Sequence, residues 1–494
     1  MGVMMRPTVS LQRFAFPAGE LLISLAILAS CAGGPASRAE KQPPSGGAVQ
    51  TETTKPTPEQ GPSAAVPEKK PTTEQLLATL PQLLEKGDYR GALGVFDSLD
   101  PAVAEKSDIR LLKASVLVSA GQADGARKIV QGIIDGDGQN TEALYVLSTI
   151  EEAAGREKEQ QALLERIVSI NPKEDRALAA LGTLTYRHRV YKTAEAYFDK
   201  SLAANPKNGE ALIGKARIRW QYQDPKGAEG LLNQAIAEYP RWAAPLVERA
   251  RVYREAGFLK EALTDLDTAK ALDGGNYWVA IDRGNVLLDL GNKAEALKEF
   301  DRAHQLDPKN FLSYVYSAGI RDEQGDYAGA ERDYAALASL KPDYYFAFEG
   351  LGTLKIKDGQ WAEAKDAFLQ AYVRSGGKSN YALLAALCWL HTGKTADLRT
   401  FLEKVLTQVS RETTEWYMLR LYYEQSGDTD ISVRIDTEKN ANTRARMLYY
   451  LAQYYDIKGN KTLADKYFLR VRDLGRQSIL EWRLNEWALE GRKL

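Results

Sequence analysis

The sequence is poor in the residues that build disulfide frameworks and transition-metal sites. Its 494 residues include only two cysteines, Cys31 and Cys388, and three scattered histidines, His188, His304 and His391. Two cysteines far apart in the chain exclude a disulfide framework and a cysteine-rich zinc site. Because histidines and cysteines do not cluster, we expect no metal and no cofactor.

An excess of charge of one sign is also missing. Lysine and arginine total 65, aspartate and glutamate total 66, and the net charge is -1. Proteins that bind nucleic acid usually present a net basic field to the phosphates, so the balance argues against a nucleic-acid partner. Hydrophobic residues make up 44% of the chain and charged residues 27%, which is typical of a soluble folded protein.

The apolar run near the N-terminus, from Leu21 to Ala29, is too short to span a bilayer. It follows a basic segment and ends at Leu28-Ala29-Ser30-Cys31, and this pattern resembles a bacterial lipobox. We therefore expect residues 1–30 to be a lipoprotein signal peptide. The resemblance implies acylation of Cys31 and a lipid anchor in the cell envelope, and Ala32 favours the outer membrane over the inner one. The alternative is an ordinary cleaved signal peptide that happens to precede a cysteine.

Residues 31–72 contain almost no large apolar side chains. They are rich in proline, glycine, serine, threonine and glutamate. Such a segment cannot bury enough apolar surface to offset the entropy of ordering the chain. The composition predicts a disordered, partly extended tether between the lipidated cysteine and a folded body.

The remaining sequence repeats with a period of 34 residues. A small residue recurs at eight of nine places with this spacing: Ala92, Ala126, Gln160 (the exception), Ala194, Ala228, Ala262, Ala296, Ala330 and Ala364. Four residues later an apolar or aromatic residue follows each time: Phe96, Val130, Leu164, Phe198, Leu232, Leu266, Phe300, Tyr334 and Phe368. A proline closes several of the units: Pro172, Pro206, Pro240, Pro308 and Pro342. A fixed period of this length is the sequence signature of a solenoid.

These positions resemble the tetratricopeptide repeat (TPR), whose pattern is W-x2-L-G-x2-Y, then A-x3-F, then P. The resemblance implies an all-α fold, a right-handed superhelical solenoid of antiparallel helix hairpins. We expect nine repeats over 73–378, degenerate hairpins over 379–444, a TPR-like repeat over 445–478 and a C-terminal helix over 479–494. That last helix is predicted to cap the solenoid; the alternative is that it binds a partner.

The resemblance also implies a concave surface formed by the first helices, at positions 2, 5, 9, 12 and 13 of each repeat. The candidate partner-binding groove consists of Arg176, Tyr186, Arg187, Arg217, Trp220, Arg251, Arg254, Trp278 and Asn285. Arginine forks match carboxylates, and aromatic rings give apolar contact at low entropy cost. These residues either bind an acidic, aromatic partner or pair with acids of the same repeat, such as Glu210 and Glu255.

We expect a non-enzymatic scaffold or adaptor that binds other proteins or peptides in the bacterial cell envelope. A surface-exposed adhesin that binds host proteins is the alternative. Two phosphate-loop-like endings, 377–379 and 393–395, lack the preceding glycine that such a loop needs and are expected to be turns. A catalytic domain is not expected, because repeats account for the ordered sequence and no group of convergent catalytic residues stands out.

Overall fold

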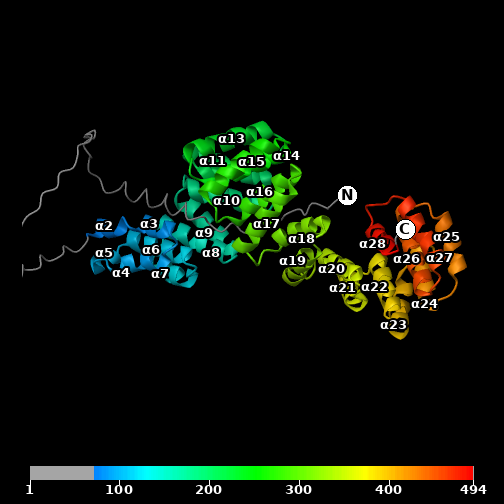
Figure 1. The fold of residues 1–494 in the computed structure, drawn as a ribbon. Helices are drawn as coiled ribbons and strands as arrows, with labels where there is room; N and C mark the ends of the chain where they lie inside the picture. The colour runs from blue at the N-terminus through cyan, green and yellow to red at the C-terminus, as the bar shows by residue number, and fades with distance from the viewer. Residues whose placement is uncertain (1–71, 493–494) are drawn as a thin grey trace, which may run out of the picture. The chain divides into compact units, whose positions relative to one another are not determined.

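The computed structural model describes residues 72–492 (Figure 1). Within that range the secondary structure is helical, and consecutive helices pack as antiparallel pairs. The prediction of an all-α solenoid of helix hairpins is thereby confirmed. The predicted signal peptide, the lipidation site Cys31 and nearly all of the tether lie outside the described residues.

The helices repeat with the period seen in the sequence. The first helices of successive hairpins begin 34 residues apart: α6 (Ser107–Ser119), α8 (Thr141–Ala153), α10 (Asp175–Arg187), α12 (Gly209–Gln221), α14 (Ala243–Glu255), α16 (Tyr277–Asp289), α18 (Phe311–Gln324), α20 (Tyr345–Lys357) and α22 (Ser379–His391). The second helices keep the same spacing: α4 (Tyr89–Asp97), α7 (Ala123–Gly136), α9 (Glu157–Ile170), α11 (Tyr191–Ala204), α13 (Pro225–Glu238), α15 (Leu259–Leu272), α17 (Lys293–Leu306), α19 (Tyr327–Leu340), α21 (Trp361–Arg374) and α23 (Thr395–Gln408).

Helices at the two ends of the described chain depart from this spacing. The N-terminal ones are short: α2 (Thr73–Leu77), α3 (Leu80–Glu85) and α5 (Pro101–Ala104). The C-terminal ones vary in length: α24 (Thr414–Glu424), α25 (Asp428–Thr437), α26 (Ala441–Ile457), α27 (Lys461–Asp473) and α28 (Leu480–Glu490). None of the described helices is long and apolar enough to cross a membrane.

The chain divides into two compact units. The N-terminal unit ends at Glu248, and the C-terminal unit begins at Arg249, so the division falls inside α14. We use these two names for described residues 72–248 and 249–492.

The recurring aromatic of the second helix holds a hairpin of the N-terminal unit together. Phe198 on α11 is fully buried. A Cβ on Gly182 of α10 would lie 2.6 Å from its ring, and a Cβ on Gly214 of α12 would lie 2.2 Å from it. The ring therefore fills a space that only glycine on the two flanking helices leaves open.

The core of the C-terminal unit is widest around α22 and α26. The α22 residues from Tyr381 to Leu390 are all buried, and so are the α26 residues from Met447 to Tyr455. Helices that are apolar on every side belong in the interior of a larger assembly of helices. The other C-terminal helices, α23, α24, α25, α27 and α28, therefore pack against α22 or α26.

Candidate protein-binding surfaces

The nine candidate groove residues all lie on first helices. The N-terminal unit carries Arg176, Tyr186 and Arg187 on α10 and Arg217 and Trp220 on α12; the C-terminal unit carries Arg251 and Arg254 on α14 and Trp278 and Asn285 on α16. All nine fall on first helices because these helices begin every 34 residues, so a given repeat position lies at the same place in each hairpin.

In the N-terminal unit the arginines are paired with carboxylates of neighbouring repeats. An Nη2 atom of Arg217 lies 2.7 Å from Glu248 Oε1, and the two side chains are 19% and 11% exposed. Arg176 pairs with Glu142 of the preceding first helix and stacks on Tyr145, 4.6 Å from the ring centroid. Each guanidinium is thus already held by an acidic or aromatic neighbour.

Arg187 shows the same arrangement at the end of α10. It lies 3.4 Å from Glu152 of α8, and each side chain is about a third exposed. Burial raises the pKa of Glu152, while the charge of Arg187 acts in the opposite direction. The half-buried ring of Tyr186 lies next to Tyr191, with ring centroids 5.4 Å apart. This part of α10 offers a cation and an aromatic side by side.

The C-terminal unit repeats the pattern. Arg251 lies 2.7 Å from Asp282 of α16, and Arg254 pairs with Asp289 of the same helix. Across both units the arginines therefore pair with Glu142, Glu152, Glu248, Asp282 and Asp289 rather than with Glu210 or Glu255. These pairs run between adjacent repeats and join one hairpin to the next. Arg176 also pairs with an acid of its own repeat, because its Nε atom lies 3.3 Å from Oε1 of Glu174, the residue just before α10.

The two remaining candidates on α16 differ in exposure. Trp278 is half-buried and meets Tyr277 edge to face, with ring centroids 5.2 Å apart. Asn285 is 7% exposed, and its side chain acts to lower the pKa of Tyr316 on α18, which burial raises. Asn285 therefore contributes to packing between α16 and α18 and presents little surface to a partner.

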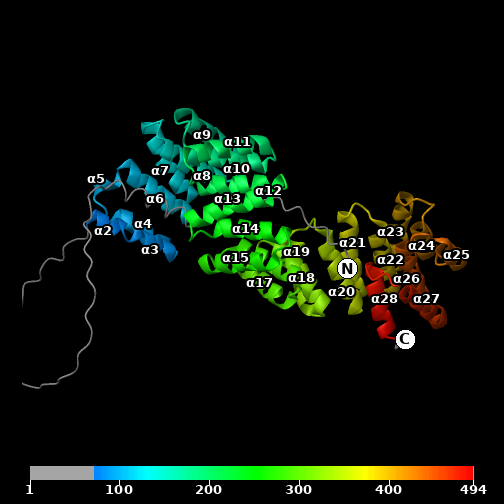
Figure 2. The ribbon, with the colours of Figure 1, turned by 90° about the horizontal axis from the view of Figure 1, so that it is seen from above.

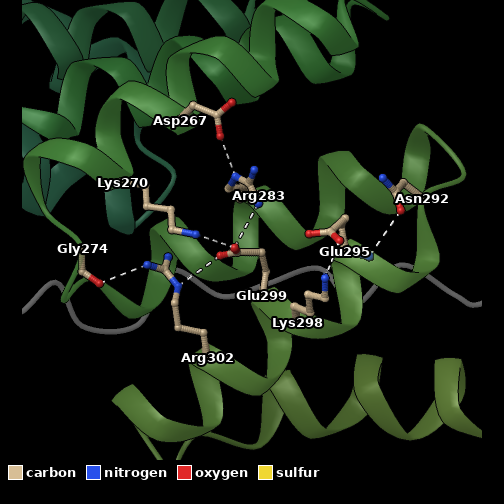
Figure 3. A network of polar contacts seen from close by, with 9 residues as sticks. All are labelled: Asp267, Lys270, Gly274, Arg283, Asn292, Glu295, Lys298, Glu299 and Arg302. Carbon is tan, nitrogen blue, oxygen red and sulfur yellow. Dashed lines mark hydrogen bonds and ion pairs between the residues drawn. The ribbon is translucent and has the colours of Figure 1, made fainter.

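A buried carboxylate on the second helix α17 of the C-terminal unit is surrounded by several cations (Figure 3), and the sequence analysis did not predict this cluster. Glu299 of α17 is 4% exposed. Its carboxylate lies 2.7 Å from Lys270 Nζ, 3.0 Å from Arg283 Nη1 and 3.1 Å from Arg302 Nε. Because the cations come from α15, α16 and α17, the carboxylate clamps three consecutive helices. The ion pairs join the three helices, although Glu299 Oε2 and Arg302 Nε and Nη2 are buried without a hydrogen bond of good geometry.

A serine, a histidine and an aspartate also come together in the C-terminal unit. Ser317 Oγ lies 3.3 Å from His304 Nε2, and His304 Nδ1 lies 3.7 Å from Asp301 Oδ1. A nucleophilic serine must reach a substrate and pass its proton to the histidine. Ser317 is fully buried, and its hydroxyl donates to Asp333 Oδ2 at 2.6 Å. The group therefore fastens α17, α18 and α19 together and does not form a nucleophilic centre.

The C-terminal helix lies against first helices of its own unit. It packs on α26 and α27 and also on α20, which precedes it by more than 120 residues (Figure 2). Arg483 of α28 makes two hydrogen bonds to Asp322 of α18, at 2.7 and 2.5 Å. The prediction of a cap did not include this long-range contact.

Comparison with known proteins agrees with this architecture. Two segments of the chain match models of the tetratricopeptide-repeat family. The matched segments are residues 190–247 and 279–310, and each model is described as tetratricopeptide repeat. Proteins built from such repeats are typically scaffolds that bind other proteins rather than enzymes.

Several solved structures are similar in part. A tetratricopeptide repeat protein from Parabacteroides merdae is 20% identical, with a TM-score of 0.39, over 50% of this chain and 98% of that one. PilF of Pseudomonas aeruginosa is 18% identical, with a TM-score of 0.37, over 42% and 95%. YrrB, described as a TPR protein with an unusual peptide-binding site, is 18% identical, with a TM-score of 0.28, over 37% and 95%. No curated protein matches the chain in sequence.

Proposed function

We propose that this protein is a non-enzymatic scaffold, anchored to a bacterial envelope membrane through an acylated Cys31, that binds protein partners on its first helices. The observation that carries the proposal is the uninterrupted series of hairpins from α6 to α23, whose first helices begin at one fixed interval. Helical repeats of this kind present side chains of their first helices to protein partners.

The anchor is supported by the sequence that precedes the described residues. A basic segment, a short apolar run and Leu28-Ala29-Ser30-Cys31 stand in the order that lipoprotein signals use. The proline-rich and glycine-rich stretch that follows would hold the folded body away from the bilayer. Several acyl chains on one cysteine give stable attachment, because each buried methylene contributes about 0.8 kcal/mol.

The partner we propose for the α10 surface is an acidic segment with an aromatic residue. Arg176 and Arg187 are 35% and 31% exposed, which leaves their outer faces accessible although each has a carboxylate neighbour. Tyr186 and Trp220 are half-buried on the same group of first helices. A partner carboxylate can share an arginine fork that an acid already occupies, because a guanidinium has five donors.

Charge reversal tests this surface. We expect Arg176→Glu together with Arg187→Glu to weaken capture of the partner at least ten-fold, since the added carboxylates repel an acidic segment. Lys192→Glu is the matched control, because Lys192 is exposed on α11, a second helix. Equal capture by both variants, with unchanged circular dichroism, would assign partner binding to another surface.

The anchor is tested by crosslinking and purification from envelope membranes. The native protein is compared with a Cys31→Ala variant. We expect the native protein to fractionate with membranes and to retain specific envelope proteins, and the variant to become soluble. A variant that stays in the membrane fraction would refute lipidation at Cys31. Degradation of the native protein by protease added to intact cells would place it on the cell surface and favour the adhesin alternative.

A further inference from the structure

The C-terminal helix α28 contacts a set of residues that come from four other helices of the C-terminal unit. They are Asp322 of α18, Tyr327 of α19, Lys357 of α20 and Tyr450 of α26. We call this surface the α28 seat. Residues between 322 and 450 form this surface, and α28 (residues 480–490) lies on it.

The first contact is a charged pair with planar geometry. The guanidinium of Arg483 donates from Nη1 to Asp322 Oδ2 at 2.7 Å and from Nη2 to Asp322 Oδ1 at 2.5 Å. The side chain of Asp322 is 11% exposed, and the side chain of Arg483 is 31% exposed. A two-point bond of this kind fixes the orientation of both partners as well as joining them.

The second contact is a cluster of two aromatic rings and two cations. Trp487 of α28 meets Tyr327 edge to face at 5.8 Å between ring centroids. Lys357 Nζ lies 4.4 Å from the Tyr327 centroid, and Arg483 lies 4.4 Å from the Trp487 centroid. Cations over aromatic faces attract through the ring quadrupole. Arg483 and Trp487 are four residues apart and therefore share one face of α28.

The seat uses the repeat positions that the first helices of this fold expose. Asp322 is the twelfth residue of α18, and Lys357 is the thirteenth of α20. Arg254 and Arg187 hold the twelfth and thirteenth positions of α14 and α10. The C-terminal helix thus lies where a partner would lie on the equivalent positions of other repeats.

Polar groups around α28 are incompletely satisfied. Among the described residues, nine buried side-chain atoms have no hydrogen-bond partner, and five of them belong to α28 or to α26 beneath it. These atoms are Trp482 Nε1, Asn485 Oδ1, Glu486 Oε1, Arg444 Nε and Arg446 Nε. Burying a polar group without a partner costs stability. These unpartnered atoms offset part of the stability that the burial of Leu484 and Leu489 gives to α28.

We propose that the α28 seat is a binding surface for a helix of a partner protein and that α28 is its resident competitor. This inference rests on the proposed scaffold function, because it names the partner class of one surface of that scaffold. The partner helix carries an arginine and, four residues later, a tryptophan on one face. The arginine matches Asp322, and the tryptophan matches Tyr327 and Lys357. Binding of the partner helix releases α28, whose apolar face then becomes exposed.

A synthetic fluorescent peptide with the sequence of residues 477–492 probes the seat directly. Binding is measured by anisotropy on the purified full chain carrying Cys31→Ala. We expect weak binding to this chain, since its own α28 competes. Adding Arg483→Ala and Trp487→Ala to the chain weakens the resident helix and leaves the seat intact, so peptide binding should tighten at least ten-fold. A further Asp322→Ala change should remove that gain.

Amide hydrogen exchange gives a second readout on the same proteins. We expect α28 to exchange at least ten-fold faster than α22 in the starting chain, and faster still after Arg483→Ala and Trp487→Ala. Arg420→Ala is the control, because Arg420 pairs with Glu424 on the exposed side of α24. Exchange in α28 as slow as in α22 for every variant, or peptide binding that Asp322→Ala leaves unchanged, would overturn the proposal. Neither result bears on membrane attachment through Cys31, which the fractionation experiment tests separately.

Discussion

The N-terminal and C-terminal units are built on the same 34-residue step and yet are stabilised differently. In the N-terminal unit, ion pairs such as Arg217–Glu248 and Arg176–Glu142 join adjacent repeats. In the C-terminal unit such pairs also occur, but Arg483 reaches Asp322 across 161 residues of sequence. The repeat therefore fixes the backbone, while contacts beyond nearest neighbours depend on individual side chains.

This difference has a consequence for cooperativity. A solenoid with contacts only between neighbours unfolds in segments, because each repeat depends on the two beside it. A long-range contact makes distant hairpins depend on one another. We therefore expect perturbations to remain local in the N-terminal unit, and in the C-terminal unit to pass between α18 and α28 as long as Arg483 holds Asp322.

The largest effect is expected from Phe198→Ala in the N-terminal unit. The ring is fully buried between helices that carry glycine opposite it, and removing such a ring costs about 3–5 kcal/mol. Amide exchange should accelerate in α10–α13. Tyr222→Ala is the control, since that side chain is 48% exposed and its loss should cost under about 0.5 kcal/mol. Equal acceleration in α26 would show that the two units unfold together.

Glu299→Ala should have the next largest effect, in the C-terminal unit. It leaves three cations without their shared carboxylate (Figure 3). Breaking a buried ion pair from one side costs about 3–5 kcal/mol, and partial exposure of the cations places the loss near the lower end. Chemical denaturation followed by tryptophan fluorescence measures it. Glu295→Ala removes the exposed pair with Lys298 and should leave the denaturation midpoint nearly unchanged, because solvent screens exposed ion pairs. Equal losses of stability in Glu299→Ala and Glu295→Ala would show that burial of the Glu299 carboxylate does not strengthen its ion pairs.

Much of the fold could be predicted from the sequence, because hairpin contacts recur at one spacing. The alanine and aromatic positions, Ala194 and Phe198 among them, identified the second helices, and the step of 34 then located the first helices. The side-chain partners could not be predicted in the same way. Periodicity shows which residues occupy the same position in successive repeats. It does not show that Arg217 forms an ion pair with Glu248 or that Arg483 forms one with Asp322. Those choices depend on packing between helices.

The turns between paired helices offer a smaller test. One residue there takes a left-handed conformation in successive repeats. It is glycine at Gly121 and Gly155 of the N-terminal unit and at Gly257 and Gly291 of the C-terminal unit, but Arg189 and Gln223 hold the two positions between them. A side chain in this region is strained, whereas glycine is not. Gln223→Gly should therefore stabilise the N-terminal unit by about 0.5–1 kcal/mol. Gly291→Gln should destabilise the C-terminal unit by a similar amount.

Thermal unfolding of the two turn variants decides this point. The space around Gly291 is open, since a Cβ there would have no neighbour within 4 Å. Any loss from Gly291→Gln therefore reports the backbone conformation alone. If Gln223→Gly lowers stability instead, the glutamine side chain makes a compensating contact, and the turns of the two units are not equivalent.

The smallest expected effect concerns two ion pairs that occupy the same repeat positions in the two units. Arg217–Glu248 and Arg251–Asp282 are each separated by 31 residues and each close at 2.7 Å. Double-mutant cycles with alanine should give coupling energies below about 1 kcal/mol in both cases, since partly exposed pairs gain little from the field between them. Equal couplings would show that adjacent hairpins are joined alike in both units. A clearly larger coupling for Arg251–Asp282 would show that the long-range contacts of the C-terminal unit also tighten its local ones, because a more rigid frame lowers the entropy lost when the pair forms.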